Sequence, residues 1–460
     1  MAEGRAFACF SRAVGLPCCP QLLLPRTDFG RPECSLGGGH ASPSEGHAVA
    51  RTVQERRRND DATAAGRIMK LGNAVSIVGW GHSPFGRLAH MDMEALIAAV
   101  CHEALVHSGF PAERMDGVWL GNLNGGFVPE IFCSSLPMNG EPGLRWKPAT
   151  RVENACASGA GAIFAACDAI QSGRARLALV VGAEKMTAVS GEEVTRILGS
   201  ASYVKEEANC GKTFPSIFGE IAGAYFERYG DHAQALAKIA VKNHANGVSN
   251  PFAQMRKALD FEFCNTVSEK NPVIAGPLRK TDCSLVSDGA AAVVLASDDL
   301  IGEAQRAVRI RARAQVNDLL PMSRRDPVRF EGPRRAFAAA FAEAGITVGD
   351  LSFAEVHDCF TIAELLAYEA MGLAPEGQGA RVLEDGTVAR GGRLPVNVSG
   401  GLKAKGHPIG ATGVSMHVLS AMQLTGTAGD MQVPGASLGG VFNMGGSAVA
   451  NYVSVLEPVK

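Results

Sequence analysis

One cysteine and one histidine lie in local sequences suited to nucleophilic catalysis. Cys156 sits among small residues directly before an alanine-rich segment with helical spacing, 162–170. A thiol at a helix start lies near unpaired backbone N–H groups, which favour the nucleophilic thiolate. His407 lies in a Gly-His-Pro-x-Gly turn, whose glycines let a substrate approach closely. A histidine can take the thiol proton before the sulfur attacks a carbonyl, so these residues predict acyl transfer.

A second histidine and a second cysteine share one short run. His357 and Cys359 belong to His-Asp-Cys-Phe, which we expect where a strand meets a helix, a common place for a site. Structural roles are the more common alternative, because free cysteines are usually buried and single histidines usually pack or face solvent. The chemistry alone leaves open a protease, a thioesterase and an enzyme that forms carbon–carbon bonds.

The composition excludes several classes of function. The chain has 460 residues, a formal net charge of -2 and no basic patch, which argues against a nucleic-acid partner. No apolar run has the length of a membrane span. Its 12 cysteines are scattered without a C-x-x-C pair, so we expect neither a metal site nor a disulfide framework. No signal peptide is evident, and the sequence favours a reducing compartment, the cytoplasm.

The chain divides into a short irregular part and a long patterned part. Residues 1–68 mix Arg, Pro, Gly and Ser without sustained periodicity, and we expect them to be a disordered extension. The alternative is that Met69 is the true start and the extension is an artefact of the gene model. From residue 69 on, apolar strands alternate with helical segments, which predicts an α/β fold with a doubly wound, largely parallel sheet.

The patterned part consists of two similar halves, 69–305 and 306–460. The first half contains an insertion, 190–281, whose helices have charged faces. The His407 loop resembles the Cys156 loop, and both pass from glycine-rich turns into small-residue helices. We expect the two loops to meet between the halves. Strands are expected at 74–79, 116–121, 177–182, 289–296, 308–314, 353–356 and 445–455, and helices at 93–107, 162–170, 220–228, 235–244, 334–344, 361–371 and 414–423.

Five motifs follow one another along the chain: Asn154-x-Cys156-Ala157-Ser158-Gly159, Gly182-Ala183-Glu184-Lys185-Met186, Ser287-Asp288-Gly289-Ala290-Ala291-Ala292, His357-Asp358-Cys359-Phe360 and Gly406-His407-Pro408-Ile409-Gly410-Ala411-Thr412-Gly413. Their order resembles that of thiolases, and the resemblance covers residues 69–460. The His-Asp-Cys-Phe run looks like the sterol-carrier-protein type of thiolase, where it replaces Asn-Glu-Ala-Phe. The resemblance implies a thiolase fold: two βαβαβαββ halves stacked as a five-layer αβαβα core with an inserted loop domain, assembled as a homodimer or tetramer.

The resemblance also implies an activity and a role for each site residue. Thiolases cleave 3-oxoacyl-CoA with CoA, or condense two acyl-CoA molecules, in fatty acid and lipid metabolism; CoA is a co-substrate and no cofactor is bound. Cys156 would be the acylated nucleophile, and His407 its base and an enolate ligand. His357 would stand where an asparagine holds a water for the enolate oxygen. The acyl oxyanion would meet the N–H groups of Cys156 and Gly445, and Ser284 would contact the pantetheine arm.

One position departs from the thiolase pattern. Asn443 stands where ordinary thiolases have the cysteine that acts as second acid and base. Cys359 is the candidate replacement, and its alternative role is a buried structural thiol. Two other interpretations stay open: a decarboxylating condensing enzyme similar to ketoacyl synthases, and a non-catalytic thiolase-like protein that binds acyl-CoA or lipid.

Four further polar residues are predicted to be solvated. Lys403 and Lys405 flank the expected site, where they could meet CoA phosphates, although solvated lysines are the more common case. His232 and His244 are expected on solvated helix faces of the insertion.

Overall fold

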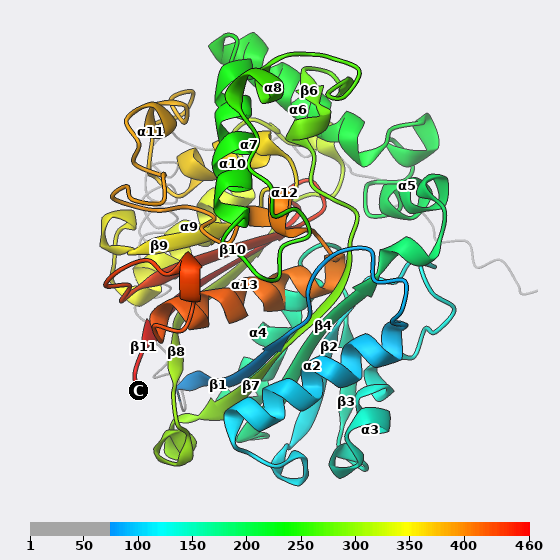
Figure 1. The fold of residues 1–460 in the computed structure, drawn as a ribbon, viewed down its shortest axis with the longest axis vertical. Coiled ribbons are helices and arrows are strands. Elements are labelled where there is room, and N and C mark those ends of the chain that lie inside the picture. Colours follow the sequence, from blue (N-terminus) through cyan, green and yellow to red (C-terminus); the bar gives the residue numbers. More distant parts are fainter. Residues whose placement is uncertain (1–73) are drawn as a thin grey trace, which may run out of the picture. The chain divides into compact units, whose positions relative to one another are not determined.

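The computed structural model describes residues 74–460, so the predicted extension 1–68 lies outside the described residues. Within them one continuous sheet of nine strands has the order β3-β2-β4-β7-β1-β8-β11-β10-β9 (Figure 1). The two ends of this order belong to the two halves of the chain. Its strands are β1 (Val75–His82), β2 (Gly117–Gly121), β3 (Ala149–Val152), β4 (Leu177–Lys185), β7 (Asp288–Ser297), β8 (Val308–Asn317), β9 (Phe353–Val356), β10 (Gly439–Gly445) and β11 (Ala450–Pro458).

The two halves repeat one arrangement of strands. In the first half β7 lies antiparallel between β4 and β1, while β2 and β3 run parallel to β4. In the second half β11 lies antiparallel between β10 and β8, while β9 runs parallel to β10. Each half therefore has parallel strands with one antiparallel strand inserted. The sequence predicted these two strands, β7 and β11, but not their antiparallel direction. The halves join where β1 pairs with β8.

Helices cover both faces of the sheet, and two of them pack against each other in the interior of the protein. Helices α4 (Ser158–Gln171) and α13 (Ile409–Leu424) pack against each other; α4 also packs on β2 and β4, and α13 on strands of both halves. Outer helices α2 (Met93–Ser108) and α9 (Glu331–Ala344) pack on the first and second half respectively. Alternating residues of β4 reach the two sides, since Val180 packs with α4 and Leu179 with α2. This is the predicted αβαβα layering.

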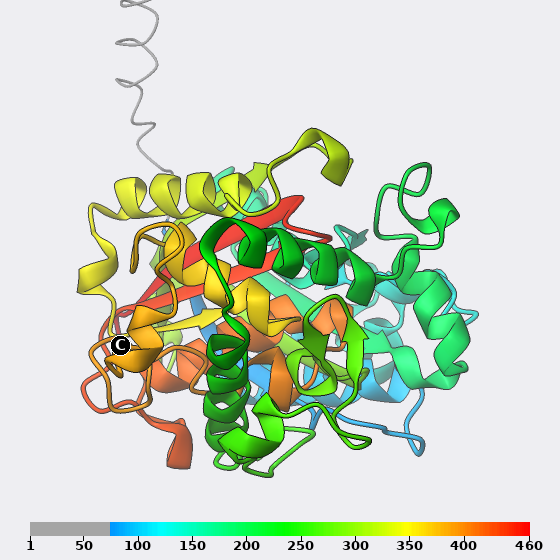
Figure 2. The ribbon, with the colours of Figure 1, turned by 90° about the horizontal axis from the view of Figure 1, so that it is seen from above.

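The segment between β4 and β7 stands outside this core. Its helix α7 (Ala233–Gly247) packs against α10 (Thr361–Ala370) and α12 (Gly401–Lys405) of the second half. In Figure 2 the green helices of the insertion lie beside yellow and orange segments of the second half. Among residues 74–460, no helix combines the length and the apolar character needed to cross a bilayer. The other elements are α3 (Pro137–Gly140), α5 (Gly191–Gly199), α6 (Phe214–Tyr229), α8 (Phe261–Asn265), β5 (Val273–Ala275), β6 (Leu278–Arg279) and α11 (Arg381–Glu384).

Candidate active site

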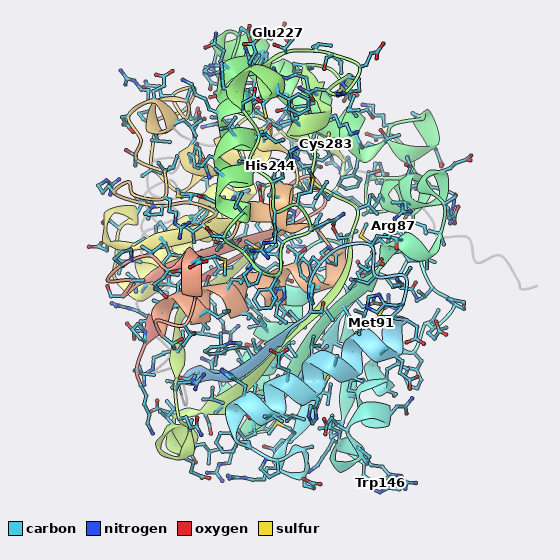
Figure 3. All side chains as sticks on the ribbon, in the orientation of Figure 1. Arg87, Met91, Trp146, Glu227, His244 and Cys283 are labelled. Atoms are coloured by element: carbon cyan, nitrogen blue, oxygen red, sulfur yellow. The ribbon has the colours of Figure 1, made fainter. Side chains whose placement is uncertain are left out.

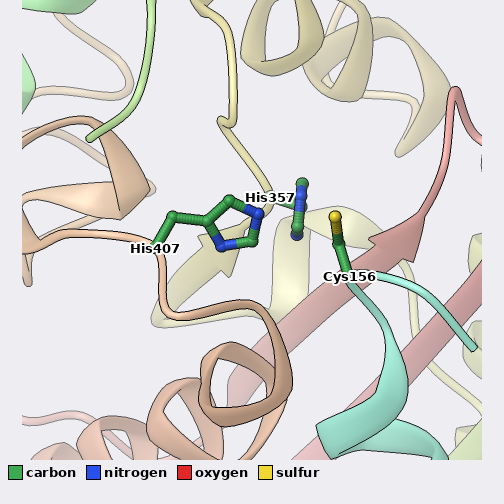
Figure 4. A group of neighbouring side chains, drawn as sticks. All are labelled: Cys156, His357 and His407. Carbon is green, nitrogen blue, oxygen red and sulfur yellow. The ribbon is translucent and has the colours of Figure 1, made fainter. Parts of the chain in front are cut away.

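Three side chains from separate parts of the chain meet between the halves. Cys156 precedes α4, His357 follows β9 and His407 precedes α13. The Cys156 sulfur and one ring nitrogen of each histidine all lie within 4.8 Å of one another (Figure 4). None of the three residues is more than 7% exposed. The structure thus brings together the predicted nucleophile and both predicted histidines.

Small residues allow this meeting. Gly159, in the first turn of α4, faces the backbone of Gly410 in the first turn of α13. A Cβ at Gly159 would lie 2.7 Å from the Gly410 carbonyl oxygen, so a larger residue would force the two helix starts apart. The run of small residues around Cys156 therefore serves the close approach of the Cys156 and His407 loops.

The Cys156 thiol is protonated in the resting site. Burial raises its pKa to about 12, although the backbone N–H groups of Gly446 and of Cys156 itself act to lower it. The expectation that a helix start would favour the thiolate is wrong here, because loss of solvent outweighs the backbone N–H groups. A base must therefore remove the proton before the sulfur can attack.

His407 has the form of that base. Its Nδ1 lies 2.7 Å from Thr412 Oγ1, and the Thr412 hydroxyl donates to the Pro408 carbonyl oxygen at 2.9 Å. Since the hydroxyl has one hydrogen, Oγ1 must accept from Nδ1–H, which leaves a lone pair on Nε2. Nε2 is buried without a hydrogen-bond partner among the described residues. Burial, then the Lys405 charge, lower the His407 pKa to about 3, so the ring stays neutral.

Buried polar residues of the other motifs hold the His407 loop. Ser287 Oγ accepts the His407 backbone N–H at 3.0 Å. Glu184 accepts the backbone N–H of Gly410 at 3.0 Å and those of the loop after β2. Asp358 accepts backbone N–H groups at the start of α12. The sequence pointed to these motifs by resemblance but could not tell that they anchor one loop.

His357 stands beside His407 with its ring nearly perpendicular. The ring centroids are 5.0 Å apart and the interplanar angle is 85°. Its Nδ1 lies 2.9 Å from Asn443 Nδ2, and its Nε2 is buried without a partner in the described part of the chain. Burial, with smaller contributions from His407 and Lys405, lowers the His357 pKa well below its ordinary value, so this ring is also neutral.

Cys359 lies at the same cavity as Cys156. Burial, and next the neighbouring Cys156, raise the pKa of the Cys359 thiol well above its ordinary value, so it carries its proton. Its carbonyl oxygen accepts the Ser284 backbone N–H at 2.9 Å, which places Ser284 next to the site. The predicted acid/base Cys359 and the predicted substrate contact Ser284 therefore lie next to each other in the lining of the cavity.

The cavity has a volume of about 320 Å³ and a mostly apolar lining. Arg87 and Cys283, which both line it, mark its place in Figure 3. Gly445 instead lines a neighbouring depression, and the N–H group that lowers the Cys156 pKa belongs to Gly446, which sequence reasoning missed. The lining includes Cys156, Met186, Val194, Leu198, Phe214, Ser284, Cys359, Phe360, His407 and Ile409.

Three residues predicted to be solvated are buried. Lys403 is 3% and Lys405 0% exposed, so neither can reach CoA phosphates in solvent. Lys405 Nζ donates to Ser415 Oγ at 3.2 Å in the interior. His244 is 1% exposed, because α7 packs its face against α12 rather than against water. The absence of a metal stays a prediction, since a thiol and two imidazoles are also ligands for zinc.

Comparisons with known proteins agree with this architecture. Residues 75–299 match the thiolase N-terminal domain and residues 314–458 the thiolase C-terminal domain-like family. An acetyl-CoA acetyltransferase of Methanothermobacter thermautotrophicus is 38% identical over 83% of this chain and 99% of that protein. Human sterol carrier protein 2 is 34% identical over 82% of this chain and 70% of that protein.

Solved structures share the fold at low identity. The Ltp2-ChsH2(DUF35) aldolase has a TM-score of 0.73 and 20% identity, over 84% of this chain and 98% of that chain. Human mitochondrial 3-ketoacyl-CoA thiolase in complex with CoA has a TM-score of 0.64 and 17% identity, over 85% of this chain and 99% of that chain. With both family models matched in order along the chain, this protein belongs to the thiolase family.

Proposed function

We propose that this protein is a CoA-dependent thiolase that transfers an acyl group through Cys156. The observation that carries the proposal is the pairing of a neutral, buried Cys156 thiol with a neutral His407, whose Nε2 has a lone pair and no hydrogen-bond partner within residues 74–460. Relatives named acetyl-CoA acetyltransferase support acyl-CoA as the substrate class. The reaction is thiolytic cleavage of 3-oxoacyl-CoA, or its reverse, the Claisen condensation.

Acylation begins with proton transfer from Cys156 to Nε2 of His407. The sulfur attacks the thioester carbonyl, and the backbone N–H groups of Cys156 and Gly446, rather than that of Gly445, stabilise the negative charge on the oxygen. The carbon–sulfur bond of the thioester breaks, and the CoA thiolate leaves with the proton held by His407. The acyl group then remains on Cys156 as a thioester.

Carbon–carbon bond formation uses the second thiol. Cys359 first gives its proton to Nε2 of His407. As a thiolate it then takes an α-proton from a second acyl-CoA, and the enolate oxygen is met by the Nε2–H groups of His357 and of the protonated His407. The enolate carbon attacks the acyl group on Cys156, and the sulfur leaves as a thiolate that takes the proton back from His407. In the cleavage direction the Cys359 thiol returns the proton to the enolate carbon, and its raised pKa keeps that proton available.

The apolar cavity suits the acyl part of such a substrate. Its lining offers few polar groups besides the proposed catalytic residues. Ser284 is one of these lining residues, and we assign to it the contact with the pantetheine arm. Assembly as a homodimer or tetramer, a role in fatty acid metabolism and a cytoplasmic location remain predictions from the sequence.

A second candidate is a non-catalytic thiolase-like protein that binds acyl-CoA or lipid. Asn443 in place of the usual second thiol favours it, and so do relatives named sterol carrier protein 2. A ketoacyl-synthase-like condensing enzyme is the third, since one cysteine and two histidines also serve that chemistry.

Assays with three substrates separate these candidates. We expect CoA-dependent consumption of 3-oxoacyl-CoA over a series of chain lengths, and no turnover by Cys156→Ser. Release of CO₂ from a malonyl thioester would instead identify the synthase. Binding of acyl-CoA without turnover at any chain length would favour the non-catalytic protein and contradict the proposal.

A further inference from the structure

We propose that Asn443 is a positioning residue that fixes the proton of His357 on Nε2, so that this histidine can serve only as a hydrogen-bond donor to the reacting oxygen. The identity of that oxygen, an enolate, rests on the proposed function. Asn443 thereby has a role of its own at the position where a thiol was expected.

The orientation of the Asn443 amide follows from its two partners. Nδ2 lies 3.1 Å from the Cys156 carbonyl oxygen and 2.9 Å from His357 Nδ1. A backbone carbonyl can only accept, so the group that faces it must be the NH₂. The flipped amide would set two acceptor oxygens against each other and lose one hydrogen bond. Both hydrogens of the NH₂ are therefore used, one on each partner.

The protonation of His357 follows from that orientation. Because the NH₂ donates to Nδ1, Nδ1 holds a lone pair, and the single proton of the neutral ring is on Nε2. Nε2 is buried and has no partner in residues 74–460. It is thus a donor left free beside Cys156 and His407 for an oxygen of the substrate.

The two histidines consequently carry opposite protonation. Thr412 holds the proton of His407 on Nδ1 and leaves Nε2 as the base, whereas Asn443 holds that of His357 on Nε2. This assigns one ring to proton transfer and the other to charge stabilisation before substrate binds. Neither assignment depends on the second thiol.

In the surroundings of Asn443 the NH₂ group makes hydrogen bonds, whereas the amide oxygen makes none within residues 74–460. Asn443 is fully buried in β10, and its Oδ1 has no hydrogen-bond donor among the described residues. A Cβ at Gly413 would collide with Oδ1, so the amide is confined by α13 and cannot rotate freely. A buried acceptor left unpaired is unfavourable. The hydrogen bonds of the NH₂ to the Cys156 carbonyl oxygen and to His357 Nδ1 offset that penalty and hold His357 next to Cys156.

The first test reads the tautomer directly. Nitrogen-15 NMR of the histidine-labelled full chain at neutral pH, with His357 assigned from the signals lost in His357→Gln, should show Nδ1 unprotonated and Nε2 protonated. A proton on Nδ1 in the wild-type protein would overturn the proposal, whatever the activity. In Asn443→Asp a carboxylate faces Nδ1, so the proton should move to Nδ1.

The second test measures the two chemical steps separately. Asn443→Asp should slow carbon–carbon bond formation or cleavage roughly 100-fold, the usual cost of losing one oxyanion donor. The rate at which Cys156 is acylated, measured in a single turnover, should fall much less. Asn271→Asp is the matched control, because Asn271 is equally buried but contacts only backbone of the insertion.

The outcomes separate this proposal from the proposed function. Unchanged tautomer and unchanged carbon–carbon chemistry in Asn443→Asp would overturn the role of Asn443 while leaving the thiolase intact. Absence of acylation and turnover in the wild-type protein would contradict the thiolase, and the NMR signals of His357 would still decide the tautomer. If Asn443→Asp fails to fold, the wild-type spectrum alone decides.

Discussion

Thr412 holds His407 in the one tautomer that can act as a base toward Cys156. The Thr412 hydroxyl donates to the Pro408 carbonyl oxygen and accepts from Nδ1–H of His407 at 2.7 Å. A single hydroxyl in the first turn of α13 therefore keeps the proton of His407 on Nδ1 and leaves a lone pair on Nε2. This relationship gives the acylation step its most specific test.

Thr412→Val should slow acylation of Cys156 by about 10- to 100-fold, because a second contact that orients a catalytic imidazole is lost while side-chain volume is kept. The rate of appearance of the acyl adduct in single-turnover mixing measures this. Thr281→Val is the control, since Thr281 is a buried threonine of the insertion whose hydroxyl meets a backbone carbonyl. A wild-type acylation rate in Thr412→Val would contradict the role given to Thr412.

Cys359→Ala should abolish carbon–carbon bond formation and leave Cys156 able to accept an acyl group. In the proposed reaction Cys359 transfers the α-proton, whereas acylation of Cys156 uses only His407 and backbone N–H groups. Condensation and single-turnover acylation are measured on the same preparation. Cys167→Ala, a buried cysteine of α4 outside the cavity, controls for loss of a core thiol. Full condensation activity in Cys359→Ala would refute the assignment.

Alkylation of Cys156 should accelerate steadily with pH. Its pKa of about 12 means that the reactive thiolate is a small fraction at neutral pH and rises about tenfold per pH unit. The iodoacetamide rate at Cys156, resolved by peptide mass spectrometry, should therefore show no plateau between pH 7 and about 10. A plateau below about pH 8 would reveal a resting thiolate–imidazolium pair instead.

Buried His417 should make the protein less stable in acid. Its pKa is lowered from 6.5 to about 4, chiefly by burial, so the unfolded chain binds a proton that the folded chain refuses between these values. The contribution of neutral His417 to the free energy of unfolding is complete above about pH 6.5. It is lost as pH falls toward 4, by about 1.4 kcal/mol per pH unit. Urea unfolding of His417→Gln should lack this component.

The comparison with wild type isolates His417 from other titrating groups. The difference in unfolding free energy between the two proteins should shrink as pH falls from 6.5 to 4. His90→Gln, at an exposed site, controls for the substitution itself. A difference that stays constant over this pH range would show that His417 is not neutral in the folded protein.

The sequence predicted those parts of the structure that local patterns encode. Apolar β-branched runs gave β1 and β4 within a few residues, and the glycine-rich turns located Cys156 and His407 at helix starts. Strand β10 was missed because its glycines and Asn443 lack the β-branched pattern of a strand. Asn443 of β10 nevertheless makes hydrogen bonds to both Cys156 and His357 in the site.

Relationships across the fold were out of reach of the sequence. Asn443 and His357 are 86 positions apart, and only the parallel pairing of β10 with β9 brings them together. Lys405 looked like a surface lysine, but α12 packs against α7 of the insertion and the buried Lys405 Nζ donates to Ser415 of α13. The thiolate prediction failed for a similar reason, since helix position is local and burial is not.

The most direct test of the account is the mass of the peptide that contains Cys156 after brief mixing of the protein with acetyl-CoA. We expect an acetyl group on Cys156 in the wild-type protein, none in Cys156→Ser, and slower acetylation in His407→Ala. An adduct on another cysteine, or wild-type protein that remains unmodified while it consumes 3-oxoacyl-CoA, would contradict acyl transfer through Cys156.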